Sequence, residues 1–63
     1  MGSYVVTVTA DYPDGTSSTR EYSAEAPDER MAENLAAALF GRDEFDLGRV
    51  APARVIARAQ PPN

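Results

Sequence analysis

The sequence predicts an α+β fold with the element order β-β-α-β, in which three antiparallel strands in the spatial order 2-1-3 carry one helix on one face. Three observations predict it: an alternating apolar segment that ends in a Pro-Asp-Gly turn, a segment with apolar residues at spacings of three and four, and a short third alternating segment. The 63 residues allow one domain, 1–63. We expect fraying at 1–3 and 60–63.

The first strand is predicted from Tyr4 to Tyr12, where the even positions are apolar or aromatic and the odd positions after Val5 are polar. A turn follows, because Pro13 presets φ at the second turn position and Gly15 accepts a positive φ at the fourth. The strong apolar character of this strand places it at the centre of the sheet.

Two hairpin registers are compatible with this turn. A three-residue loop with Gly15 as a bulge pairs Val6 with Tyr22, whereas a two-residue Asp-Gly loop would set Val6 beside Ser23 and mix apolar with charged residues on one face. We predict the first register, since it keeps the apolar residues together. It also turns all three tyrosines toward the helix, as core residues and not as a platform for stacking bases.

A helix is predicted from Pro27 to Phe40, because proline suits the first helical position and Gly41 is a typical C-terminal stop. Five apolar residues share the face expected to pack on the sheet: Met31, Ala32, Leu35, Ala38 and Leu39. Residues 43–47, DEFDL, are expected to form an irregular turn whose Phe45 and Leu47 close the open end of the core.

The third strand is predicted over 53–59. Burying two unpaired guanidinium groups would cost several kcal/mol, so Val55 and Ala57 should face the helix. The opposite, uncovered face should then have Val5 and Ile56 at an apolar centre, with threonines around it and acids across from the arginines. The candidate partner-binding residues are Val5, Thr7, Glu21, Arg54, Ile56 and Arg58.

Catalysis has few groups available, because histidine, cysteine and lysine are all absent. We therefore predict no enzyme activity, no catalytic residue and no cofactor. The acids Asp43, Glu44 and Asp46 lack the glycine and terminal glutamate of a calcium loop, so a solvated turn is favoured over a metal site there. Whether they bind a cation stays open at this point.

Size and composition favour self-association. Apolar residues make up 43% of the chain, but eleven of them are alanine, and no cysteine is present to form a disulfide. A homodimer is the usual remedy for so small a core. Arginine is the sole basic residue and alanine is abundant, which points to a GC-rich coding sequence of actinobacterial or phage origin.

The net charge of −4 argues against a general attraction to nucleic acid or to an anionic membrane. No apolar run has the length of a bilayer span and no signal peptide is visible, so a cytoplasmic protein is expected.

The function that these observations favour is a small non-enzymatic protein-interaction module, either a regulator or a phage accessory or inhibitor protein. It would act through the open sheet face and a strand edge, on a protein partner or on a second copy of itself. The alternative is a nucleic-acid-binding domain that uses Arg49, Arg54 and Arg58, since the chain from Arg49 onward has three arginines and no acid. A metal-dependent enzyme built on the carboxylates is a third, weaker alternative.

Overall fold

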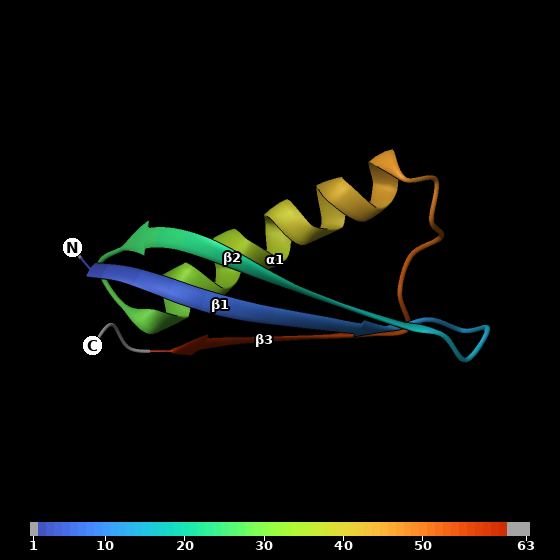
Figure 1. Cartoon of the computed structure of the whole chain (residues 1–63), viewed down its shortest axis with the longest axis horizontal. Coiled ribbons are helices and arrows are strands. Elements are labelled where there is room, and N and C mark those ends of the chain that lie inside the picture. Colours follow the sequence, from blue (N-terminus) through green and yellow to red (C-terminus); the bar gives the residue numbers. More distant parts are fainter. Residues whose placement is uncertain (1, 61–63) are drawn as a thin grey trace.

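The computed structural model describes residues 2–60 and has the predicted α+β architecture. Its elements are β1 (Gly2–Asp11), β2 (Ser17–Ala26), α1 (Glu29–Asp46) and β3 (Arg54–Gln60). The strands pair in the order β2-β1-β3, and both pairings are antiparallel. Figure 1 shows α1 lying obliquely to the strands, with the connecting segment returning from its end to the start of β3.

The hairpin has the bulged three-residue loop. Val6 lies opposite Tyr22, the Tyr12 amide donates to the Thr16 carbonyl at 2.9 Å, and the Gly15 amide donates to the Tyr12 carbonyl at 3.0 Å. Gly15 has a φ of +90°, a conformation that glycine adopts without steric cost. The predicted register is therefore confirmed.

The sorting of side chains between the two faces of the sheet is also confirmed. In β3, Ala57 and Ala59 pack against the core, whereas Arg54, Ile56 and Arg58 are exposed. Since successive side chains of a strand alternate between faces, the two arginines lie on the face that α1 leaves uncovered.

The core is small and rich in alanine. Its largest fully buried side chains are Phe40, Val6 and Val8. The complete buried apolar cluster is Val6, Val8, Ala10, Tyr12, Ala24, Ala26, Ala32, Ala36 and Phe40. Alanines line both the sheet and the helix where they meet, so the backbone of α1 lies close to the sheet. Few large side chains are therefore removed from water.

The helix boundaries differ from the prediction of Pro27 to Phe40. The helix begins at Glu29 and is capped by Asp28, whose carboxylate accepts a hydrogen bond of 2.8 Å from the Met31 amide. It continues through Gly41, which was predicted to end it. The glycine with positive φ at the helix end is Gly48, at +80°.

The inward face of α1 also differs from the prediction. The buried residues are Ala32, Ala36, Phe40 and Glu44, a row at spacings of four. Of the five residues predicted to face the sheet, Ala32 alone is buried. The row that faces the sheet contains short alanines and Phe40, so the larger leucines lie on the side of the helix.

Phe45 and Leu47 do not close the core as predicted. Their exposed fractions are 78% and 64%. Because residues 43–46 are helical, Glu44 takes the inward position after Phe40, and its neighbour Phe45 is rotated toward solvent.

Both described ends of the chain belong to the sheet. Gly2 pairs with Ala26 and Gln60 pairs with Val5, so these residues are part of strands, and their fraying stays a prediction. The rest of that prediction lies outside residues 2–60. Within this range, no helix is both long enough and apolar enough to span a bilayer.

Candidate functional site

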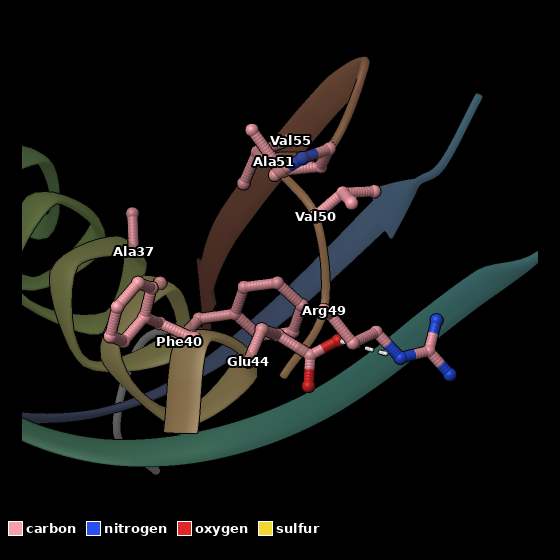
Figure 2. A pocket seen from close by; sticks show the side chains of 10 residues that line it. Ala37, Phe40, Glu44, Arg49, Val50, Ala51 and Val55 are labelled. Carbon is pink, nitrogen blue, oxygen red and sulfur yellow. Dashed lines mark ion pairs between the residues drawn. The ribbon is translucent and has the colours of Figure 1, made fainter. Parts of the chain in front are cut away.

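A cavity of about 260 Å³ opens between the C-terminal half of α1 and the segment that connects it to β3. We call it the end groove (Figure 2). Its walls are mostly apolar: Ala37, Phe40, Gly41 and Phe45 from α1, Val50, Ala51 and Pro52 from the connecting segment, and Val55 from β3. Figure 2 shows Ala37 and Phe40 on one side and Val50, Ala51 and Val55 on the other.

The rim of the end groove exposes large apolar side chains. Phe45 is 78% exposed, Val50 71% and Val55 42%. Among residues 2–60, the large side chains that are fully buried in the core are Phe40, Val6 and Val8, so the groove rim exposes as many large apolar side chains as the core buries fully. An exposed apolar rim beside a cavity is typical of a site that binds another molecule.

One end of the groove is formed by a polar cluster centred on the buried Glu44, which is 3% exposed. The Tyr12 hydroxyl donates a hydrogen bond to Glu44 Oε1, and a guanidinium nitrogen of Arg20 lies 3.2 Å from Oε2. Arg49 Nε lies 3.9 Å from Oε1, and its guanidinium carbon stands 4.7 Å from the centre of the Tyr12 ring. Two arginines thus surround one buried carboxylate.

The protonation states of this cluster follow from its contacts. The hydrogen bond from Tyr12 lowers the pKa of Glu44, helped by Ser18 and the two arginines and opposed by burial. Burial, followed by the contact with Glu44, raises the pKa of the Tyr12 phenol. At neutral pH Glu44 is therefore a carboxylate and Tyr12 a neutral phenol, so the pair is poorly suited to acid–base catalysis and joins the helix end to the hairpin.

The predicted sheet-face residues share one face, but in a different arrangement from the expected one. Arg54 pairs with Asp11 in register, and Arg58 pairs with Thr7, whose other neighbour is Glu21. The arginines therefore stand near polar or acidic partners.

The apolar centre expected on this face is not formed. Ile56 lies opposite Thr9 and Val5 opposite Gln60, so the two apolar residues are four strand positions apart, roughly 13 Å. Thr7 lies between them. Within residues 2–60, Val5 and Ile56 are therefore separated on the sheet face and do not form a continuous apolar patch.

The three arginines of the nucleic-acid alternative do not share one surface either. Arg54 and Arg58 are on the sheet face, whereas Arg49 sits at the end groove, paired with Glu44 and stacked on Tyr12. The bias of positive charge in the sequence is thus divided between two sides of the molecule.

The acids Asp43, Glu44 and Asp46 do not converge. Asp43 accepts a hydrogen bond of 2.7 Å from the Tyr22 hydroxyl, and Glu44 points inward to its own partners. Over the part of the chain that the structure describes, no three acidic side chains are placed as metal ligands would be.

Sequence reasoning missed both the Glu44 cluster and the end groove. The signal that could have found them is the row Ala32, Ala36, Phe40, Glu44 at spacings of four, which is visible once Gly41 is not taken as a helix stop. Comparisons of the chain with known protein families, with curated proteins and with solved structures each found no match, so the site is interpreted from its geometry alone.

Proposed function

We propose that this chain is a non-enzymatic protein-interaction module whose partner inserts a large apolar side chain into the end groove. The observation that supports this most directly is Phe45, which is 78% exposed on the rim of an apolar cavity of about 260 Å³. Because Phe45 stays in water in the folded chain, it contributes little to folding, and a bound partner would gain the apolar area that it covers.

A protein partner suits the groove better than a small molecule does. Pockets for small ligands measure roughly 300–1,000 Å³ and carry several polar groups that orient the ligand. Here the cavity is slightly smaller, and its main polar group, Glu44, already has Tyr12 and two arginines as partners. The remaining walls are apolar, as in a pocket that takes a single anchor side chain of a protein.

The absence of enzyme activity is part of the proposal. It is supported by the lack of histidine, cysteine and lysine and by the state of Glu44, whose lowered pKa makes it a weak base. The open sheet face is left out of the proposed site, because Val5 and Ile56 lie apart on it.

Selection of short peptides from a random library against the full chain tests the proposal. We expect the selected peptides to share a large apolar anchor residue, and we expect Phe45→Ser to weaken their binding at least tenfold. The matched control is Leu47→Ser, because Leu47 is 64% exposed but does not line the cavity. A selection without binders, or binders that respond equally to both variants, contradicts the proposal.

A further inference from the structure

We infer that the free edge of β2, together with the apolar row Met31, Leu35 and Leu39 of α1, binds a second copy of this chain. We call this the β2-side surface. It lies on the opposite flank of α1 from the end groove. The dimer would join two three-stranded sheets edge to edge through their β2 strands, with both helices on the same face.

The first observation is the unpaired edge of β2. The strand order β2-β1-β3 leaves one side of β2 without a neighbouring strand. The main-chain pairing of Tyr12 with Thr16 sets the alternation along the hairpin, so the even residues of β2 bond to β1 and the odd residues direct their amides and carbonyls outward. These outward residues are Ser17, Thr19, Glu21, Ser23 and Glu25.

The edge of β3 differs in this respect. The Ala59 amide donates a hydrogen bond of 2.9 Å to the carboxylate of Glu33 on α1. A charged side chain therefore occupies one of the outward amides of this edge, and charged groups at an edge are a common way to prevent strand addition. Of the two edges of the sheet, β2 is the longer, with ten residues against seven in β3.

The second observation is an exposed apolar row on the flank of α1 whose C-terminal end contacts β2. Met31, Leu35, Leu39 and Asp43 follow one another at spacings of four, so they lie along one flank of α1. Asp43 reaches Tyr22 of β2, which identifies this flank as the β2 side. The three apolar residues are 46%, 43% and 41% exposed.

The charges along β2 favour a second copy of the same strand. An antiparallel pair centred on Tyr22 sets Glu21 opposite Ser23 of the other copy, and Thr19 opposite Glu25. A pair centred on Glu21 would oppose the two copies of Glu21, and one centred on Ser23 would oppose Glu21 and Glu25. Centring on Arg20 would oppose two arginines. The register centred on Tyr22 pairs the two β2 strands over residues 18–26, and it places no two like charges opposite each other.

The area of this surface is sufficient for a dimer. Paired over residues 18–26 at about 3.3 Å each, the strands run together for roughly 30 Å, and the edge plus helix is roughly 20 Å high. This amounts to roughly 600 Å² per copy, or about 1,200 Å² in total, at the lower limit for stable complexes. Because the core of one copy is small, burial of this surface in a dimer would add apolar contacts that stabilise the fold.

Sedimentation of the full chain tests the inference. At about 100 µM, we expect the chain to sediment at twice its mass of 6.8 kDa. Ser23→Pro, which removes an outward amide and leaves the bonds to β1 in place, should sediment as a monomer. Ser23→Ala keeps the amide and should remain a dimer. A monomeric parent chain, or a dimeric Ser23→Pro, overturns the inference.

A second variant guards against a proline that simply unfolds the strand. Leu35→Glu changes the helix flank and leaves β2 unaltered, and circular dichroism reports whether α1 is kept. We expect a folded monomer. Asn34→Glu, at an exposed neighbouring position, is the control and should remain a dimer. A dimeric and folded Leu35→Glu excludes the helix row from the interface.

The register itself is tested with single cysteines, because the chain has none of its own. A mixture of Glu21→Cys and Ser23→Cys chains should form a disulfide between the two variants on mild oxidation, since these positions face each other across the dimer. Either variant alone should crosslink at least fivefold less, because its own copies are diagonal and about 7–8 Å apart. Equal crosslinking in all three samples contradicts the register.

The end groove serves as a further control. Phe45→Ser should remain a dimer, whereas it should lose the selected peptides. Ser23→Pro should do the reverse. Each proposal can therefore fail while the other stands.

Discussion

The hydroxyl of Tyr12, just after β1, donates a hydrogen bond to the carboxylate of Glu44 in the last turn of α1, 32 residues further along the chain. Arg20 from β2 and Arg49 from the connecting segment form ion pairs with this carboxylate. One buried acid thus joins four parts of the chain: the C-terminal end of α1, the residue after β1, β2 and the connecting segment. The end groove depends on that junction, because Glu44 and Arg49 are among its walls.

Acid should destabilise the protein partly through Glu44. Its pKa is lowered in the fold, so the stability that it contributes is complete above its unfolded value of 4.5 and is lost as the pH falls through the lower folded value. Tyr12→Phe removes the main cause of the lowered pKa. We expect the variant to melt at a lower temperature near pH 7 and to lose less of its melting temperature on acidification to about pH 3.

Thermal unfolding followed by circular dichroism across this pH range checks the prediction. The comparison of the two proteins separates Glu44 from the other carboxylates, which are common to both. Melting temperatures that fall in parallel for the parent chain and Tyr12→Phe would show that the hydrogen bond does not control the acid response.

Alkali should act through Tyr22. Burial, and next the hydrogen bond to Asp43, raise the pKa of Tyr22 to about 12. A raised pKa means that the contribution of this phenol to stability is complete below its unfolded value of 10.0 and is lost as the pH rises toward 12. In a spectrophotometric titration of the folded protein, Tyr22→Phe should therefore lack part of the ionisation at the highest pH. An unchanged titration above pH 10.0 argues against the contact with Asp43.

The two phenylalanines should differ sharply in their contribution to stability. Phe40 is 1% exposed, so Phe40→Ala should cost about 3–5 kcal/mol, which is comparable with the total stability of a domain of this size. Phe45→Ala should change the stability by less than about 0.5 kcal/mol, because the side chain is 78% exposed. Urea denaturation at a concentration where the chain is in one oligomeric state measures both. Similar costs for the two variants would contradict the exposure of Phe45.

Alanine should have opposite effects at two glycines. Gly41 is helical and has no atom within 4 Å of an added Cβ, so Gly41→Ala should stabilise the protein by about 0.5–1 kcal/mol. Gly15 has a φ of +90°, so Gly15→Ala should strain the turn and destabilise the protein by about 1 kcal/mol. Differential scanning calorimetry should show a higher melting temperature for the first variant and a lower one for the second. A lower melting temperature for Gly41→Ala would indicate that a flexible residue is needed within α1.

Much of the sheet was predictable because its signals are local and strict. A slip of one residue would have turned Val6 away from Tyr22 and reversed every side chain of the hairpin, so the pairing of apolar residues selects one register. The outward direction of Arg54 and Arg58 follows from the cost of burying an unpaired guanidinium group.

The helix was less predictable, because its local signals were outweighed by contacts made after folding. Gly41 is a reasonable stop in isolation, but Glu44 finds Tyr12 and Arg20 on the hairpin, and these contacts favour one more turn. The inward row then passes from Phe40 to Glu44, and Phe45 is left on the rim of the end groove.

The sequence by itself determined the β-β-α-β order, the register of the hairpin and the face on which each arginine lies, because strand alternation and turn chemistry act between residues close in the chain. Only the tertiary structure decided where α1 ends, which of its rows is buried and which of its flanks is exposed. These depend on how closely an alanine-lined helix approaches an alanine-rich sheet, and on a carboxylate that finds its partners 32 residues away.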